Sequence, residues 1–382
     1  MIKIKYLLII LSVFALSCQE EESNQPRKSI SLNTHNVWQN DSTAILLGDT
    51  IKQRSNSIDY HNSNSPHLTY IPNDVSTIFL YDILQQKVIQ KIPLQIEGPN
   101  GLGAGQLGVQ FVNKDTIIIG NMNFLVAIIN SKGEVIYKRS FSKDIGNIKE
   151  GQPTVETTKK AVLYNNKIYL NAHAYLDASK LEDFEDFPCL YELDLKTDKI
   201  ATVFNLPTTY YTKGLYGANY ASSFNTYNSK TKEFVWSFRN DPNVYTYSLV
   251  TKKTKAFHAP SKDFDEIPPM SKGLDASDLK TYFKFWTKSN SYGPIYYDEF
   301  KDVYYRFAEK AVDDIRYKEK KLWKFTSLMV MNKDFQKIGE IDMEDGFNNK
   351  ECFVTPKSFF IRKYDKKNDK NLFIGFNAVS KK

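Results

Sequence analysis

Two arginines follow short aromatic runs, and they are the residues of this sequence best suited to bind an anion. Arg239 comes directly after Trp236-Ser237-Phe238, and Arg306 comes directly after Tyr304 and Tyr305. Because a guanidinium donates paired hydrogen bonds to a carboxylate, these side chains could line a funnel and hold a carboxylate or a sugar-acid group. The same arginines could instead lock neighbouring structural units by pairing with Asp241, Asp298 or Asp302. The sequence favours neither interpretation.

A glycine-rich segment is a second candidate for binding. Five of the eleven positions from Gly98 to Gly108 are glycine, and Asn100 lies among them as a candidate ligand-binding side chain. Such a segment adopts unusual backbone angles or allows another group to come close. No helix pattern follows it and no Gly-Lys-Ser or Gly-Lys-Thr closes it, which argues against a dinucleotide or phosphate loop. It is either a ligand loop or a connection between structural units, and we prefer the connection.

Motifs for catalysis or metal binding are missing from the sequence. There is no His-Glu-x-x-His, no Gly-x-Ser-x-Gly and no Cys-x-x-Cys, and the histidines at 35, 61, 67, 173 and 258 never have a helical metal-binding spacing. His61 and His67 flank Asn and Ser residues typical of a loop, where we expect solvated side chains. We therefore predict no catalytic residue, no metal and no cofactor.

The first 17 residues have the order of a signal peptide. Lys3 and Lys5 precede an apolar run at 6–16, and the small residue Ser17 follows. As a helix this run would extend roughly 16 Å, about half of the hydrocarbon thickness of a bilayer. We therefore expect residues 1–17 to be removed on export rather than to span a membrane.

The end of the leader, Ala15-Leu16-Ser17-Cys18, resembles a bacterial lipobox, in which the cysteine receives a lipid before cleavage. Its leucine lies one place off, and ordinary secretory cleavage beside an unmodified Cys18 is the alternative. The residues at 19–22 resemble the acidic signal that sends lipoproteins of Bacteroidetes-type bacteria to the outer face of the outer membrane, although a solvated tether would look similar. We expect lipid on Cys18 to hold the protein to the outer membrane, with surface exposure preferred to the periplasmic side.

The rest of the chain divides into a lipidated N-terminus with a flexible linker at 18–40 and one domain at 41–382. The net charge is +7 and the basic residues are scattered, which argues against nucleic acid as a partner of an exported protein. Cys189 and Cys352 each begin an apolar run. We expect two buried free thiols, and the alternative is a disulfide, which an exported location permits.

One unit recurs along the domain: an alternating apolar or aromatic strand, a turn with Asp, Asn or Ser, and a second strand. The first strands of these units are Ile78–Asp82, Val126–Asn130, Leu190–Asp194, Val244–Ser248, Leu328–Asn332 and, at the end of the chain, Leu372–Asn377. Further strand candidates precede each hairpin, and four short strands per roughly 45 residues are typical of a β-propeller. The sequence therefore predicts an all-β, six-bladed β-propeller, with a β-sandwich or two smaller β-domains as the alternative.

Two further features of this propeller are predicted by the parts of the chain that do not fit the repeat. The last unit has no room for an outer strand, so we predict that a segment at about 42–51 closes the ring from the N-terminal side. The longer units carry helical insertions, which we expect at 181–187, 275–286 and 308–321. Asp275 or Ser277 is the expected cap of the second insertion, because a small polar side chain often precedes the first turn of a helix.

Three segments resemble a known family. Residues 97–103 (Glu-Gly-Pro-Asn-Gly-Leu-Gly), 237–245 and 298–307 resemble DUF4221, a family of uncharacterised Bacteroides-type lipoproteins. That family is similar to the six-bladed propellers related to TolB and NHL repeats. The resemblance implies the propeller fold and brings no activity with it.

Three functional hypotheses follow. The first is a binding or scaffold lipoprotein without catalytic activity, which holds a glycan, a peptide or an envelope protein on one face of the propeller. The second is a propeller-type lyase or hydrolase acting on an envelope or dietary polymer, which requires Arg239, Arg306 and Tyr304 or Tyr305 to meet a carboxylate or histidine in one pocket. The third is a subunit of an envelope complex, which predicts a large exposed apolar patch.

Overall fold

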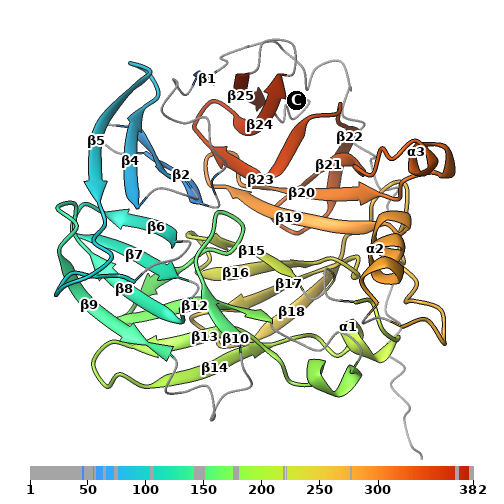
Figure 1. Cartoon of the computed structure of the whole chain (residues 1–382), viewed down its shortest axis with the longest axis horizontal. Helices are drawn as coiled ribbons and strands as arrows, with labels where there is room; N and C mark the ends of the chain where they lie inside the picture. Colours follow the sequence, from blue (N-terminus) through green and yellow to red (C-terminus); the bar gives the residue numbers. More distant parts are fainter. Residues whose placement is uncertain are drawn as a thin grey trace, which may run out of the picture.

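The computed structural model describes residues 45–46, 55, 57–62, 66–72, 76–103, 107–121, 123–141, 151–174, 180–217, 220, 222–275, 278–365 and 370–377. These residues form six antiparallel sheets that follow one another around a common centre, as the blades of a six-bladed β-propeller (Figure 1). The predicted fold is confirmed, and the sandwich alternative is wrong. The predicted signal peptide, Cys18 and most of the linker lie outside the described residues.

The blades follow chain order, and the first strands contact each other between blades 1 and 2, 4 and 5, 5 and 6, and 6 and 1. Blades 1 and 2 consist of β2 (Ser57–His61), β3 (His67–Ile71), β4 (Thr77–Asp82) and β5 (Lys87–Pro93), then β6 (Leu107–Asn113), β7 (Thr116–Asn121), β8 (Leu125–Ile129) and β9 (Val135–Ser140). Blades 3 and 4 consist of β10 (Gly151–Thr154), β11 (Val162–Tyr164), β12 (Lys167–Ala174), β13 (Pro188–Asp194) and β14 (Ile200–Asn205), then β15 (Ser223–Asn228), β16 (Glu233–Phe238), β17 (Asn243–Ser248) and β18 (Thr254–His258). Blades 5 and 6 consist of β19 (Ser291–Asp298), β20 (Val303–Lys310), β21 (Phe325–Met331) and β22 (Lys337–Asp342), then β23 (Phe347–Val354), β24 (Phe359–Asp365), β25 (Lys370–Phe376) and β1 (Ile45–Leu46).

The middle strands of the blades are apolar on both faces because a neighbouring blade covers each face. In β7 the consecutive residues Ile117, Ile118 and Ile119 are all fully buried. Ile117 and Ile119 belong to the cluster shared with blade 1, whereas Ile118 belongs to the cluster shared with blades 3 and 4. Burial of one such side chain stabilises the fold by roughly 1.5–3 kcal/mol relative to exposure. The cores of this protein therefore lie between the blades.

The turn residues of the repeat stop the strands by a shared mechanism. The Oδ1 atom of Asp82 accepts hydrogen bonds from the backbone N–H groups of Leu84 and Gln85, both at 2.8 Å. The side chains at 130, 194, 248 and 332 accept equivalent bonds from backbone N–H groups two or three residues further on. An Asx or Ser turn of this kind reverses the chain, and of these five turns only the one after Asn130 contains a glycine, Gly133 with a φ of 81°. The predicted hairpins are confirmed at all five positions.

The ring is closed by the N-terminal part of the chain. Strand β1 pairs antiparallel with β25, with Ile45 opposite Phe373 and Leu46 opposite Leu372. It is thus the fourth strand of blade 6, whose other three strands come from the C-terminal end. The predicted closure by a segment at about 42–51 is confirmed for these two residues.

The two faces of the propeller differ. Antiparallel strands place the start of each first strand, the link between second and third strands and the connection to the next blade on one face, which we call the helix face. The helices all lie in these links: η3 (Leu181–Phe184), α1 (Thr209–Thr212), α2 (Leu279–Lys288) and α3 (Asp314–Lys318). The opposite face, with the remaining links of each blade, is the turn face. No described helix has the length and apolar character needed to span a membrane.

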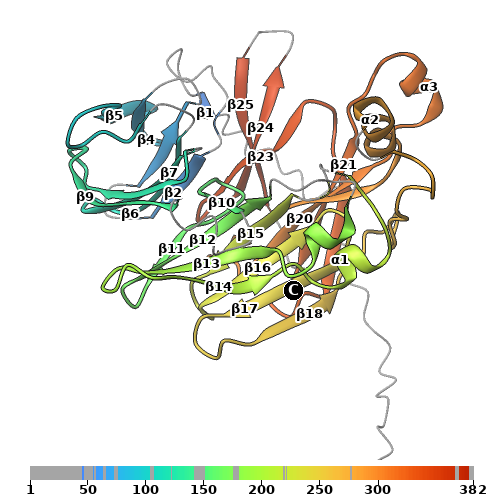
Figure 2. The same ribbon diagram turned by 60° about the horizontal axis from the view of Figure 1, so that its bottom comes forward.

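The helical insertions differ from the sequence prediction in two places. Helix α2 is capped by Asp278, whose side chain accepts from the N–H of Thr281 at 2.9 Å, so Asp275 is not the cap, and Ser277 lies outside the described residues. The helix predicted at 308–321 is shorter, because β20 continues to Lys310 through its pairing with β21. Helices α2 and α3 lie side by side next to blade 5, where the N–H of Val312 donates to the carbonyl of Thr287 at 2.9 Å (Figure 2). Their side chains Leu279, Phe283 and Ile315 are exposed.

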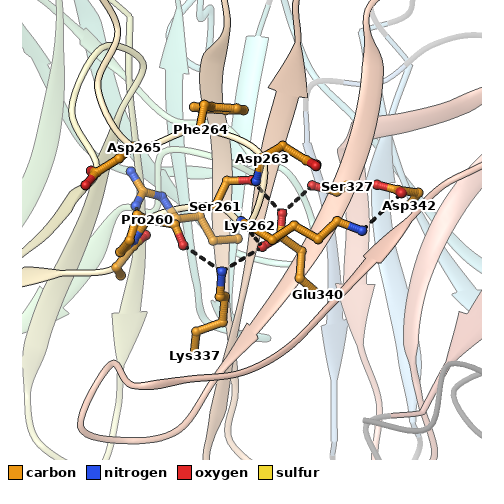
Figure 3. A network of polar contacts seen from close by, with 12 residues as sticks. Pro260, Ser261, Lys262, Asp263, Phe264, Asp265, Ser327, Lys337, Glu340 and Asp342 are labelled. Atoms are coloured by element: carbon orange, nitrogen blue, oxygen red, sulfur yellow. Dashed lines mark hydrogen bonds and ion pairs between the residues drawn. The ribbon is translucent and has the colours of Figure 1, made fainter. Parts of the chain in front are cut away.

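A polar network fastens the loop after β18 to blade 5 (Figure 3). Glu340 accepts hydrogen bonds from Ser261 Oγ at 2.6 Å, from the N–H of Lys262 at 2.7 Å and from Ser327 Oγ at 2.8 Å. Lys262 Nζ contacts Asp342 at 3.0 Å. Lys337 Nζ also donates to Glu340, at 3.0 Å. Because charge-assisted hydrogen bonds are stronger than neutral ones, one carboxylate with four donors holds this inter-blade loop in place.

Candidate functional site

The inner strand of blade 3 is interrupted, and the interruption crosses the centre of the propeller. Strand β10 pairs with the second half of β12 and β11 pairs with its first half, which leaves residues 155–161 between them. We call residues 155–161 the crosspiece. Its backbone turns back on itself, with mutual hydrogen bonds between Glu156 and Lys159.

The crosspiece contacts three other blades. Thr157 Oγ1 accepts from the N–H of Ile58 in blade 1 at 2.7 Å, and the N–H of Asn225 in blade 4 donates to the carbonyl of Thr158 at 2.8 Å. Toward blade 2, a Cβ atom added to Gly108 would lie 1.6 Å from the carbonyl oxygen of Val155. The crosspiece therefore divides the axis of the ring into a part toward the turn face and a part toward the helix face.

This contact also explains one end of the glycine-rich segment. Residues 98–103 lie in the connection from β5 to β6, in agreement with the preferred interpretation, and Gly98 and Gly103 have positive φ angles of 85° and 78°. Gly108 lies inside β6, where it lets the crosspiece come close. Its role is thus the close approach that only a residue without Cβ permits.

A pocket of about 400 Å³ lies at the turn-face end of the axis, and we call it the axial pocket. Each of the six blades contributes residues from its inner strand or the adjoining turn, and the crosspiece contributes Lys160 and Ala161. Seven aromatic residues line it: Tyr60, Phe111, Tyr227, Tyr296, Tyr297, Phe300 and Phe353. The polar lining residues are Asp59, His61, Gln110, Lys160, Thr226, Ser229 and Glu299.

The polar groups in this pocket are coupled across blades 1, 2 and 3. Asp59 forms an ion pair with Lys160 at 3.0 Å and accepts a hydrogen bond from the amide of Gln110. Burial would raise the pKa of Asp59, but the positive charge of Lys160 and the nearby His61 outweigh burial and lower it. Burial lowers the pKa of His61 to about 4. At neutral pH the pocket therefore holds an ionised carboxylate and a neutral imidazole.

The histidines of blade 1 are not the solvated loop residues that the sequence indicated. His61 is the last residue of β2 and His67 the first of β3, and their ring centroids are 5.2 Å apart. Phe111 packs against both rings, and His67 is only 7% exposed. In the part of the chain that the structure describes, no three His, Cys, Asp or Glu side chains come together as a metal site.

Both remaining cysteines are buried free thiols, in agreement with the preferred prediction. Cys352 belongs to the wall of the axial pocket, and burial raises its pKa well above the usual range. Because the thiolate is the reactive form, this burial lowers the reactivity of Cys352.

Arg306 lies between blades 4 and 5 and is fully buried. Its guanidinium donates to the carbonyl oxygens of Asp241 at 2.7 Å, Pro242 at 2.5 Å and Ala259 at 3.1 Å. It also stacks on the ring of Tyr292 at 3.9 Å. Arg306 thus joins two blades, as one interpretation of the sequence proposed, but through backbone carbonyls instead of aspartate carboxylates.

The other predicted residues are also engaged within the fold. Tyr304 accepts from Asn228 Nδ2 at 2.7 Å, and Tyr305 stacks on Phe359 of blade 6 with ring centroids 4.3 Å apart. Asn100 Oδ1 accepts from the N–H of Val135 at 3.0 Å. None of these residues, nor Arg239 or Arg306, lines the axial pocket. The convergence that the lyase or hydrolase hypothesis requires is therefore not found there, and ligand binding by these five residues stays a prediction.

Arg239 differs from Arg306 because it points to a polar cluster at the helix-face end of the axis. Its Nη1 donates to Glu309 Oε2 at 3.0 Å, and Glu309 also accepts from Ser291 at 2.8 Å and from Asn349 at 2.9 Å. Burial would raise the pKa of Glu309, but Arg239 and Lys324 outweigh it and lower the pKa to about 2. This second polar region contains one of the two arginines that the sequence singled out.

The pocket residues Asp59, Gln110 and Lys160 escaped the sequence prediction. Asp59 and Gln110 are polar residues within strands, and Lys160 ends the polar run that begins at Glu156; the three residues are 51 and 50 positions apart along the chain. Their shared signal is position, since Asp59 and Gln110 both lie in the first strand of a blade. That signal becomes readable only when the register of the blades is known.

Comparison with known proteins agrees with this architecture. Residues 34–342 match the profile of DUF4221, described as a domain of unknown function. A solved DUF4221 member from Bacteroides vulgatus ATCC 8482 has a TM-score of 0.73 at 22% identity, with 88% of this chain and 96% of that chain covered. A candidate exported protein from Bacteroides fragilis NCTC 9343 has a TM-score of 0.52 at 13% identity, with 87% and 92% covered.

At these identities the solved structures show the fold alone, and no curated protein matches the sequence. The profile match is different in kind, because it extends over five of the six blades and so over well more than half of the chain. The chain belongs to the DUF4221 family, and its fold is a six-bladed β-propeller.

Proposed function

We propose that this protein is an exported binding protein of the cell envelope, and that its axial pocket holds a short glycan or a similar uncharged polar ligand. The observation that carries the proposal is the construction of the pocket from all six blades. Its volume of about 400 Å³ falls within the range of roughly 300–1,000 Å³ typical of small-molecule sites. A rigid ring that presents one such depression at its centre is suited to binding.

The lining favours an uncharged polar ligand. Aromatic rings offer flat apolar faces, and the few polar groups between them fix the orientation of a ligand by hydrogen bonds. The charges of Asp59 and Lys160 offset each other through their ion pair. A sugar unit combines apolar C–H faces with hydroxyl groups. Its C–H faces would pack on the aromatic rings, and its hydroxyl groups would form hydrogen bonds with the polar side chains.

The location is part of the proposal. The leader at 1–17 and Cys18 support lipid attachment to the outer membrane, and the similar Bacteroides fragilis protein is described as a candidate exported protein. Labelling of cells with an alkyne-bearing fatty acid should modify the wild-type chain, and Cys18→Ser should remove the label. Digestion of intact cells by added protease would separate a surface protein from a periplasmic one.

Ligand binding is tested with an array of bacterial and dietary glycans, followed by titration calorimetry on the hits. Asp59→Asn keeps the shape of the pocket and removes the ion pair, and Phe300→Ala removes one aromatic wall. We expect Asp59→Asn to weaken binding roughly tenfold or more, because a hydrogen bond to a charged group contributes about 1.5–3 kcal/mol. We expect Phe300→Ala to weaken binding too, because it removes an apolar face for the ligand. Asp334→Asn, in an exposed turn of blade 5, is the matched control and should bind like the wild type. If no glycan binds, or if both pocket variants bind unchanged, the proposal is wrong.

A further inference from the structure

Four cationic side chains lie within electrostatic reach of one another at the helix-face end of the axis, one from each of blades 3 to 6 or the adjoining links. They are Lys159, Arg239, Lys324 and Lys350, and we call them the basic cluster. The neighbouring carboxylates are Glu156, 3.6 Å from Lys159, and Glu309. His173, which contacts Lys159 at 3.2 Å, is held neutral because burial lowers its pKa to about 4. Positive charge therefore exceeds negative charge in this region.

The carboxylate at the centre of the cluster is already occupied. Glu309 accepts from Arg239, Ser291 and Asn349, and Ser291 Oγ also accepts from Lys324 Nζ at 2.9 Å. These contacts order the cations but leave like charges next to one another. Besides burial, Arg239 lowers the pKa of both Lys324 and Lys350, and Lys159 also lowers that of Lys350. A like-charge cluster of this kind is unfavourable in the free protein, and an added anion would relieve the repulsion.

Two donors of the cluster have no hydrogen-bond partner within the described part of the chain. The Nε atom of Arg239 is buried, and the side chain as a whole is only 6% exposed. Lys350 is an exposed residue as a whole, although burial is the first cause that lowers the pKa of its ammonium, and this ammonium makes no hydrogen bond or ion pair among the described residues. Lys350 lies in a bulge, because the pairing of β23 with β24 jumps from Asn348 directly to Cys352. Bulges of this type redirect a side chain away from the strand ladder.

Aromatic rings hold two of the cations in place. Arg239 lies over Phe224 at 4.8 Å, and Lys324 lies over Trp286 at 4.4 Å. These contacts keep the charged groups oriented before any ligand arrives, which reduces the entropy lost on binding. The crosspiece separates this region from the axial pocket, so the two ends of the axis are chemically distinct.

We propose that the basic cluster is a second binding site, which takes an oxyanion group of a ligand, either a carboxylate or a phosphate. Lys350 and the Nε–H of Arg239 donate to the oxyanion, and Lys159 and Lys324 supply further positive charge. Of the two arginines that the sequence indicated, Arg239 belongs to this site. Arg306 does not, because it is enclosed between blades 4 and 5.

Titration calorimetry of the full chain at pH 8 with inorganic phosphate, glucuronate and neutral glucose tests this site. We expect phosphate or glucuronate to bind and glucose not to compete. Lys350→Gln should weaken the binding roughly tenfold to a hundredfold, since the lost bond is charge-assisted. Lys357→Gln, an exposed lysine in a turn of the same blade on the turn face, is the control and should leave it unchanged.

A second readout separates this site from general screening of surface charge. Burial first, and then Arg239, lower the pKa of Lys324 to about 7, so most of this side chain is deprotonated at pH 8. Binding of an oxyanion should draw a proton onto it, and the measured heat should then depend on the ionisation enthalpy of the buffer. Binding of phosphate alone would indicate a phosphoryl ligand, and binding of glucuronate alone would indicate a carboxylate ligand. No binding of either anion, or equal binding by Lys350→Gln, would overturn the proposal.

Discussion

Arg306 joins blades 4 and 5 through several backbone carbonyls, so its replacement removes several charged hydrogen bonds in one step. Burial lowers its pKa to about 10, which still leaves it charged at neutral pH. We expect Arg306→Met to lower the free energy of unfolding by about 3–5 kcal/mol, because the carbonyls of Asp241 and Pro242 lose their partner. Urea denaturation measures the change. Arg306→Lys should also destabilise the protein, since an ammonium cannot reproduce the planar fork of donors.

His61 makes the stability of the propeller sensitive to acid. Burial lowers its pKa to about 4, below the usual 6.5, so folding favours the neutral ring. The stabilisation is present above pH 6.5 and is lost as the pH falls from 6.5 toward 4. We expect His61→Asn to reduce the loss of stability between pH 7 and pH 4.5 by about 2 kcal/mol. Denaturant titrations at both pH values measure this slope, and His258→Asn, on an exposed residue, is the control.

The two arginines show what single residues could and could not predict. Their place after aromatic runs indicated that both were special, and both are indeed held by several partners. Which partner each one has depends on chain far away: Glu309 lies 70 positions from Arg239 and Ala259 lies 47 from Arg306. The identity of residues adjacent in sequence contains no information on such long-range contacts.

At the scale of the elements, the position of the crosspiece depends on Gly108, the residue without a side chain in β6. Gly108→Ala would place a Cβ 1.6 Å from the carbonyl oxygen of Val155. We expect a loss of about 3 kcal/mol or more, because β6 cannot move without breaking its sheet and the crosspiece is fixed by its hydrogen bonds to blades 1 and 4. Gly273→Ala is the control: its φ of +88° adds backbone strain of about 1 kcal/mol, but no atom lies within 4 Å of the new Cβ. Equal losses in the two variants would show that the crosspiece does not need this close approach.

The outer hairpins of the blades were predictable from sequence, whereas the inner strands were less so. Hairpins such as β4 with β5 combine an apolar strand with an Asx turn, and both signals are local. The inner strand of blade 3 contains an interruption that no local signal marks. The crosspiece, Val-Glu-Thr-Thr-Lys-Lys-Ala, is polar enough to resemble an ordinary loop. Its position at the centre follows only from contacts with blades 1, 2 and 4.

For the whole molecule, closure of the ring by β1 is the feature open to direct test. A chain that begins at residue 41 should retain β1, whereas a chain that begins at residue 51 loses it. We expect the shorter chain to unfold at a lower temperature, because β25 becomes an unpaired edge and blade 6 keeps three strands. Hydrogen exchange should then rise first in β25. If both chains protect β25 equally, β1 does not close the ring.

The overall architecture was the most predictable level. Six repeats and the lack of room for a last outer strand together indicated a closed six-bladed ring, and the pairing of β1 with β25 agrees. The two polar ends of the axis were not predictable, since each gathers side chains from blades far apart in sequence. The sequence repeat specifies the blades. The residues at the axis of the ring lie where the chain departs from this repeat, as it does in the crosspiece.

Closure by the N-terminal strand also has a mechanical meaning. If a lipid on Cys18 holds the protein, any pull between membrane and propeller enters the fold at β1, which in the described part of the chain is joined to β25 through Ile45 and Leu46. A load on so short an edge strand can open its hydrogen bonds one after another, instead of shearing them all at once. Blade 6 would then open before the other blades. The pairing of β1 with β25, which completes the ring, would be the first part of the fold to separate under force.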